Sequence, residues 1–128
     1  MKILAGIIGS GVGLSHLKAI NMHNKAEIVC LCEKNKIKRE LLKKKFPNLQ
    51  VTDNEKDIFY NKKINLVSIA SYDNYHFNQL VKAIKFNKHV IVEKPICLTK
   101  YQLNKIYNLS KKKKFIFFKN FNFMKMVM

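Results

Sequence analysis

Strand-like and helix-like segments alternate along this chain, and the alternation constrains the fold more than any other feature. Short apolar runs are followed by segments with apolar residues at helical spacing, joined by brief links. The expected strands are residues 2–8, 26–32, 49–52, 64–70 and 89–93, with a last one after the lysine run 111–114. The expected helices are residues 13–23, 36–46, 54–61 with an Asn54 cap, 74–87, and a segment capped by Thr99 that runs through Leu109.

Strands that alternate with helices across short links predict a parallel sheet covered on both faces. Right-handed crossovers then give a doubly wound α/β sheet, the Rossmann fold. With 128 residues and neither an internal repeat nor a flexible linker, the chain is expected to form one domain. We place this domain at residues 1–118 and an apolar tail at 119–128.

The stretch "IIGSGVGLSH", residues 7–16, has the composition of a dinucleotide-binding loop between a strand and a helix. Gly9 supplies the turn, and Gly11 removes the side chain where phosphates would lie. Gly13 comes one residue early for the third glycine but falls where the helix must pack closely against the first strand. An ordinary glycine turn is the alternative, because such a loop alone is weak evidence. The predicted pyrophosphate-binding residues are Gly9, Ser10, Gly11, Val12 and Gly13.

Glu33 follows the second expected strand, where an acid accepts hydrogen bonds from the adenosine ribose hydroxyls. A carboxylate there repels a 2′-phosphate, so the sequence favours NAD over NADP. Lys34, the next residue, weakens this preference and leaves NADP as the alternative cofactor. A solvent-facing carboxylate at a strand end is the other interpretation of Glu33. The order of strand, loop and helix favours the cofactor site.

Two further stretches carry a resemblance to a known family. They are "SIASYDNYH" (68–76) and "NKHVIVEKP" (87–95), where a Glu-Lys-Pro tripeptide follows an expected strand. Together with the glycine loop and its trailing His16, they resemble the glucose–fructose oxidoreductase/inositol dehydrogenase (Gfo/Idh/MocA) family. The resemblance covers about residues 3–110. It implies a Rossmann domain that binds NAD(P) in an oxidoreductase acting on a sugar, cyclitol or nucleotide sugar.

The resemblance also implies roles for single residues. Glu93 would contact the ribose on the nicotinamide side, and His76 matches the motif histidine, with helix capping or packing as an equal alternative. Family members usually carry Thr-Pro-Asn where this chain has Ser-Tyr-Asp, so the contacts of this segment depart from the pattern. The residues implied to line the cofactor are Ala70, Ser71, Tyr72 and Asp73.

Lys94 matches the catalytic lysine of the family, beside the carbon that gives or takes hydride. A cation there stabilises a developing alkoxide and can relay its proton. Pro95 would fix the backbone so that Lys94 points into the cleft at the carboxyl ends of the strands. A surface Glu-Lys ion pair is the competing interpretation in so lysine-rich a chain.

Charge indicates which macromolecular partners to expect. The chain has 25 Lys plus Arg against 8 acidic residues, a formal net charge of +17. Arg39 is the only arginine, whereas nucleic-acid sites favour arginine for its bidentate geometry. We therefore attribute the bias to a general drift toward lysine and asparagine, and expect only weak, nonspecific polyanion binding.

The three cysteines, Cys30, Cys32 and Cys97, lack zinc-like spacing, and no metal site is expected. Cys30 and Cys32 should share one face of a strand as reduced thiols, which favours a cytoplasmic protein. No apolar run approaches the ~20 residues of a membrane span, and the glycines of the first segment argue against a secretion signal.

The resemblance implies a second, larger α/β domain that carries the substrate pocket, and this chain ends before it. We expect no hydride transfer by the chain alone, because substrate has nowhere to be held. The apolar segment from Phe115 would expose surface for a partner or for self-association. Three hypotheses remain: the cofactor-binding half of an oxidoreductase, which we favour; a non-catalytic nucleotide-binding remnant; and a basic nucleic-acid-binding protein.

Overall fold

The computed structural model describes residues 2–112 and 117–119 of the chain. The strands are β1 (Ile3–Ile8), β2 (Ala26–Cys32), β3 (Gln50–Thr52), β4 (Leu66–Ile69), β5 (His89–Val92) and β6 (Phe117–Lys119). The helices are α1 (Gly13–Asn21), α2 (Lys36–Lys45), α3 (Lys56–Phe59), α4 (His76–Lys85) and α5 (Lys100–Lys111), with a 3-10 turn, η1 (Asp73–Tyr75), before α4. The expected order of elements is confirmed.

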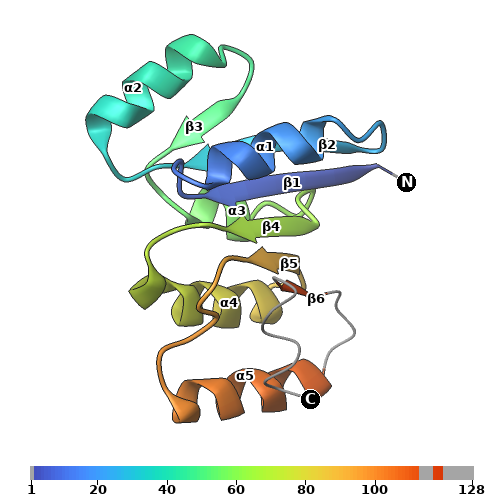
Figure 1. The fold of residues 1–128 in the computed structure, drawn as a ribbon. Coiled ribbons are helices and arrows are strands. Elements are labelled where there is room, and N and C mark those ends of the chain that lie inside the picture. Colours follow the sequence, from blue (N-terminus) through green and yellow to red (C-terminus); the bar gives the residue numbers. More distant parts are fainter. Residues whose placement is uncertain (1, 113–116, 120–128) are drawn as a thin grey trace.

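The six strands form one parallel sheet in the order β3-β2-β1-β4-β5-β6, which descends from top to bottom in Figure 1. The chain runs from β1 outward to β3 and then returns to β4 on the other side of β1. Ile8 pairs with Cys32 of β2 and with Ile69 of β4, so these three strands end at one level. This order places a switch point between β1 and β4, where doubly wound sheets bind ligands.

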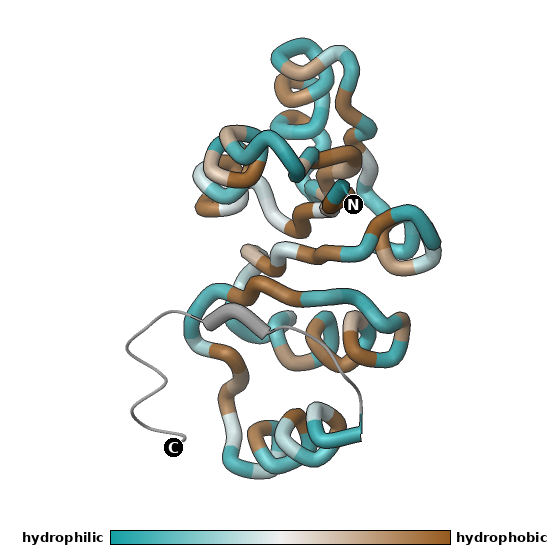
Figure 2. The backbone as a smooth tube through the Cα atoms, turned by 90° about the vertical axis from the view of Figure 1, so that its right-hand side faces the viewer, coloured by the Kyte–Doolittle hydropathy of each residue, from teal (hydrophilic) through white to brown (hydrophobic). Residues whose placement is uncertain are grey.

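Each face of the sheet buries its own apolar core. On one face, Leu17 of α1 and Leu42 of α2 pack with Ile7 and Leu31 of the sheet. The opposite face packs against α3, α4 and α5. That core contains Ile8, Cys30, Cys32, Ile58, Phe59, Val67, Ile69, Leu80, Ile84, Val90 and Ile106. Figure 2 shows hydrophobic residues concentrated along the strands and alternating with hydrophilic residues in the helices. The doubly wound fold is therefore confirmed.

Helix starts follow the capping chemistry of the sequence. The Thr99 hydroxyl accepts a hydrogen bond from the Gln102 N–H at 3.1 Å, as expected of a helix cap. Asn35 caps α2 in the same way. The expected position of the Asn54 cap is wrong, because α3 begins at Lys56 and Glu55 is its N-cap residue. The Asn54 side chain instead accepts from the Lys56 N–H at 3.0 Å.

Most other predicted elements differ from the observed ones by one or two residues at an end, and two of these differences have a clear structural cause. The strand predicted at 64–70 is shorter, because the Ile64 N–H bonds to the Asn61 carbonyl in a turn before β4. The helix predicted at 74–87 begins as the separate 3-10 turn η1. The domain boundary at residue 118 stays a prediction, because residues 120–128 of the expected tail lie outside the described residues.

The cysteines lie as the alternation of the second strand predicts. Cys30 and Cys32 are buried in the same core cluster, Cys97 is half-buried, and all three are free thiols. Within residues 2–112 and 117–119, no helix combines the length and apolarity that crossing a membrane requires.

Candidate functional site

A cavity of about 790 Å³ opens where the carboxyl ends of β1, β2 and β4 meet the loops that follow them. Its position is the switch point of the sheet, the usual ligand site of this architecture. Eight of the residues predicted from the sequence line it together: Gly9, Ser10, Gly11, Val12, Glu33, Ala70, Ser71 and Tyr72.

Each of the three glycines of the loop suits its position for a different geometric reason. Gly9 has a positive φ of 98°, and a Cβ there would lie 2.4 Å from the Ala70 carbonyl oxygen. A Cβ at Gly13 would lie 2.9 Å from Ile7, which reflects the close packing of α1 on β1. A Cβ at Gly11 would meet no protein atom within 4 Å. The backbone at Gly11 is thus open to a ligand, and the short loop still packs its helix tightly.

The N-terminus of α1 carries no side-chain cap. Its N-cap residue, Val12, makes no capping hydrogen bond, and the first turn holds no acidic residue. The N–H groups of Leu14 and Ser15 bond to the Gly11 and Val12 carbonyl oxygens, at 3.2 and 2.9 Å. The positive end of the helix dipole nevertheless suits an anion. Since Gly11 and Val12 line the cavity, this helix end and the open backbone can hold a pyrophosphate.

The Glu33 carboxylate is fixed at the end of β2. It accepts hydrogen bonds from the Ser10 hydroxyl, from the Ser10 N–H at 3.2 Å and from the Asn35 N–H at 2.9 Å. Partial burial acts to raise the pKa of Glu33, but these hydrogen bonds and nearby Lys38 outweigh it and hold the pKa below its ordinary value. Glu33 is therefore a carboxylate at neutral pH, positioned against the glycine loop.

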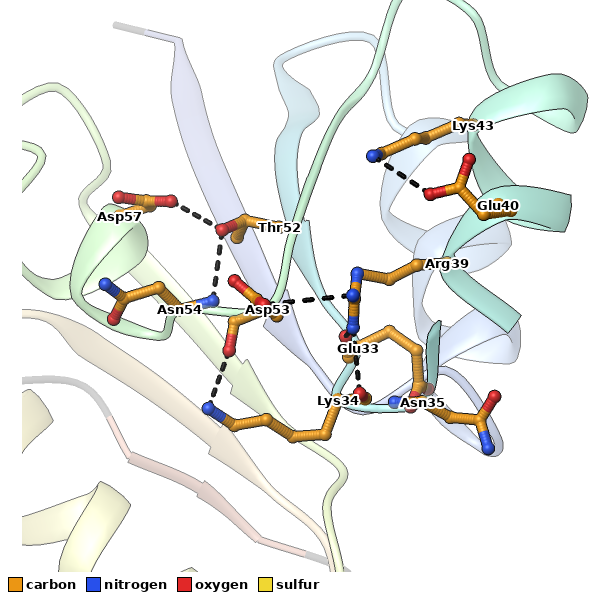
Figure 3. A network of polar contacts seen from close by, with 10 residues as sticks. All are labelled: Glu33, Lys34, Asn35, Arg39, Glu40, Lys43, Thr52, Asp53, Asn54 and Asp57. Atoms are coloured by element: carbon orange, nitrogen blue, oxygen red, sulfur yellow. Dashed lines mark hydrogen bonds and ion pairs between the residues drawn. The ribbon is translucent and has the colours of Figure 1, made fainter. Parts of the chain in front are cut away.

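Two basic residues, Arg39 and Lys34, donate hydrogen bonds to backbone carbonyl oxygens around Glu33, as Figure 3 shows. Arg39 of α2 donates to the carbonyl oxygens of Glu33 and Lys34, at 3.1 and 2.8 Å, and lies 3.8 Å from the Asp53 carboxylate. The Lys34 amino group donates to the Asp53 carbonyl at 2.6 Å. Arg39 thus holds the loop after β2, while Lys34 and Lys38 bring positive charge to the cavity.

Part of the cavity wall is a polar network that the sequence did not indicate. Glu55 accepts from Lys82 at 2.5 Å and from Gln79 at 3.1 Å, and Gln79 accepts from the Ser71 hydroxyl at 2.5 Å. These residues come from the segment before α3, from α4 and from the loop after β4. Only tertiary structure brings them together. The cavity residues not predicted from the sequence include Lys34, Lys38, Glu55, Tyr75, Gln79 and Lys82.

His76 lies beside the cavity and not in its lining. It is 1% exposed, with Nδ1 2.6 Å from the Pro95 carbonyl oxygen and Nε2 3.0 Å from the Ser71 carbonyl oxygen. The imidazole therefore joins the loop after β4 to the Glu-Lys-Pro segment. This placement corresponds to the packing interpretation of the motif histidine.

The remaining predicted residues lie along the same edge of the sheet, outside the cavity lining. Glu93 follows β5, and its N–H bonds to the Ile69 carbonyl at 2.9 Å. Its carboxylate lies 2.8 Å from His16 Nε2. Lys94 and Asp73 are exposed, and Gly13 is buried in the first turn of α1. Lys94 is joined to Pro95 by a cis peptide bond. Among the described residues, no cluster of three or more potential metal ligands occurs.

Comparisons with known proteins agree with this geometry. A family model described as the oxidoreductase family with an NAD-binding Rossmann fold matches residues 3–121. An uncharacterised oxidoreductase of Synechocystis sp. is 24% identical over 123 residues, which cover 95% of this chain and 33% of that protein. The D-glucoside 3-dehydrogenase of Escherichia coli is 26% identical over 108 residues, or 83% of this chain and 31% of that enzyme.

Among solved structures, an NAD-binding protein from Listeria innocua superposes with a TM-score of 0.84 at 24% identity. The match covers 94% of this chain and 35% of that one. It supports the fold. The chain thus spans about a third of the length of the relatives it matches.

Proposed function

This chain belongs to the GFO_IDH_MocA family of oxidoreductases with an NAD-binding Rossmann fold, and we propose that it binds NAD across the cavity at its switch point. The pyrophosphate lies over Gly11 and the N-terminus of α1, and the adenosine ribose lies at Glu33. The observation that carries this proposal is the contact between Ser10 and Glu33, which joins the glycine loop to the ribose-binding position in one cavity.

The negative charge of Glu33 is the reason that we propose NAD, and not NADP, as the cofactor. Its lowered pKa keeps it ionised, so a 2′-phosphate at the same place meets electrostatic repulsion. NADP is the second candidate because Lys34 and Lys38 line the same cavity. Lys34 already donates to the Asp53 carbonyl, which limits its availability for a phosphate.

For the reaction, we propose that this chain supplies the cofactor-binding part of a larger enzyme that transfers hydride at a secondary alcohol of a sugar-like substrate. The nicotinamide ring supplies the hydride chemistry when the cofactor is bound. Lys94 is exposed at the carboxyl end of β5, where its ammonium can stabilise an alkoxide oxygen and exchange a proton with it. The Escherichia coli relative is a D-glucoside 3-dehydrogenase, which supports this substrate class.

Calorimetric titration of NADH, then NADPH, into the purified chain at moderate salt tests the binding function. Saturable binding with at least about tenfold preference for NADH is expected, which corresponds to about 1.4 kcal/mol. Glu33→Ala should weaken NADH binding by about tenfold, since two ribose hydrogen bonds to a charged group are lost. Glu40→Ala is the matched control, because Glu40 pairs with Lys43 on α2 and does not line the cavity.

Three results would contradict the proposal or part of it. A folded chain that binds neither dinucleotide would make the glycine loop an ordinary turn. A Glu33→Ala variant with unchanged NADH affinity would show that Glu33 does not bind the ribose. A preference of the wild-type chain for NADPH would make NADP the cofactor in place of NAD.

A further inference from the structure

His16, in the first turns of α1, bridges two strands that lie on the far side of β1 from Glu33. Its Nδ1 lies 2.6 Å from the hydroxyl of Ser68 in β4, and its Nε2 lies 2.8 Å from Oε1 of Glu93 at the end of β5. Ser68 is completely buried, and the side chains of His16 and Glu93 are 17% and 27% exposed. A buried hydroxyl, an imidazole and a partly exposed carboxylate thus form one line of hydrogen bonds.

The direction of these hydrogen bonds follows from the groups that form them. An ionised carboxylate only accepts, so the proton between His16 and Glu93 belongs to Nε2. In the neutral ring, Nδ1 then accepts from the Ser68 hydroxyl. The Glu93 carboxylate therefore fixes the tautomer of His16, and the Ser68 hydroxyl donates to the other ring nitrogen.

The place of this line in the fold relates it to the cofactor. A dinucleotide that crosses the switch point with its adenosine at the end of β2 extends its other half over β4 and β5. Glu93 stands at the end of β5, next to Lys94. Only Oε1 of Glu93 is engaged by a donor among the described residues, which leaves Oε2 for the hydroxyls of a ligand.

We propose that His16 is a positioning residue that, with Ser68 behind it, holds the Glu93 carboxylate in place for the nicotinamide half of the cofactor. The inference rests on the proposed function, since it assigns no ligand other than the dinucleotide. It adds to the site a histidine of the glycine-loop helix and a buried strand serine, neither of which lines the cavity. Ser68 is a hydroxyl within a fully buried strand, and its partner His16 accounts for its presence there.

A double-mutant cycle with NADH titration tests the proposal. His16→Leu and Glu93→Gln should each weaken NADH binding by about fivefold, and the double variant by about the same fivefold, because both changes disable one carboxylate. His16→Gln, whose amide can donate to Glu93 and accept from Ser68, should bind within about twofold of the wild type. His23→Leu, at an exposed histidine beyond the end of α1, is the matched control and should bind as the wild type does.

Nitrogen-15 spectra of the histidines in the cofactor-free chain give a readout that does not depend on binding. His16 should show the Nε2–H tautomer, and Ser68→Ala, a small change that keeps the strand packed, should shift the Nδ1 resonance because that nitrogen loses its hydrogen-bond donor. Effects that multiply to about 25-fold in the double variant, or a Ser68→Ala chain with an unchanged His16 spectrum, would overturn the inference while the cofactor function stands. A wild-type chain without NADH binding would overturn the proposed function and this inference with it.

Discussion

Ser10 donates both its backbone N–H and its hydroxyl to Oε2 of Glu33, so the glycine loop and the end of β2 are tied together by one residue. The contact explains why Glu33 keeps a lowered pKa although it is partly buried. It also places a charged acceptor beside the open backbone of Gly11. The glycine loop and the acid that we propose to bind the ribose are therefore one structural unit.

Replacing Ser10 with Ala should raise the pKa of Glu33 toward its ordinary value of 4.5, because the hydroxyl that stabilises the carboxylate is lost. A group whose pKa is lowered by folding stabilises the fold above its unfolded value and stops doing so as the pH falls through its folded value. Ser10→Ala should therefore cost about 1 kcal/mol at pH 7, a figure reduced for partial exposure, and less below pH 4.5.

Carboxyl carbon-13 titration and urea unfolding between pH 7 and pH 3 measure both effects. Ser15→Ala, an exposed serine of α1, is the control and should change neither quantity. A stability loss in Ser10→Ala that stays constant across this pH range would show that the hydroxyl contributes by packing and not through the Glu33 carboxylate.

Two glycines of the loop should separate stability from binding. Gly9→Ala forces a Cβ to 2.4 Å from the Ala70 carbonyl oxygen at a positive φ, and should cost about 2 kcal/mol or more of unfolding free energy. Gly11→Ala meets no protein atom within 4 Å, so its unfolding midpoint should stay near that of the wild type. Its NADH affinity should nevertheless fall at least tenfold, because the methyl group occupies the phosphate position. Equal losses of unfolding free energy in the two variants would contradict the separate roles of Gly9 in stability and Gly11 in binding.

Periodicity and glycine placement predicted the parts of this fold that local sequence determines. The strand at 26–32 was predicted to the residue, because its apolar alternation is unbroken. Gly13 was interpreted as the close-packing glycine despite its early position, and its contact distance to Ile7 agrees. The predicted helix at 74–87 includes most of the 3-10 turn at Asp73–Tyr75, because apolar spacing does not distinguish a 3-10 turn from the start of an α-helix.

The polar part of the cavity wall could not be predicted, because no local pattern encodes it. Glu55 and Gln79 lie 24 positions apart and meet only when the loop after β3 folds against α4. The bridge from Ser68 through His16 to Glu93 likewise joins three separate elements. The motifs indicated which segments would converge at the edge of the sheet, but the partners of each side chain depend on tertiary packing.

The two strand cysteines should resist thiol reagents in the folded protein. Burial, aided by the charge of Asp57, raises the pKa of Cys30 to about 12, and burial raises that of Cys32 to about 11, so almost no thiolate exists at pH 8. Cys97 is half-buried and should react first, although burial raises its pKa as well. A colorimetric thiol assay should find one reactive group in buffer and three in denaturant. Cys97→Ser should abolish the reaction in buffer, and rapid labelling of Cys30 would contradict the packing of the core.

Lys88 is a buried cation that joins two loops. It is 4% exposed, and its amino group donates to the Asn61 and Ile64 carbonyl oxygens, both at 2.7 Å. Lys88→Met should cost about 2–4 kcal/mol of unfolding free energy, because two carbonyl groups lose a charged donor. Lys105→Met, at an exposed position of α5, is the control and should change stability by less than about 0.5 kcal/mol.

The pH dependence of the Lys88→Met effect identifies its cause. Burial lowers the pKa of Lys88 from its ordinary 10.5, so between the folded and unfolded values the unfolded chain binds the extra proton. Stability contributed by Lys88 therefore rises as the pH increases through the lowered folded value toward 10.5. Urea unfolding at pH 7 and pH 10 should show a larger difference between wild type and Lys88→Met at pH 10, and the other lysines cancel in this comparison. A difference that shrinks at pH 10 would mean that the pKa of Lys88 is not lowered by folding.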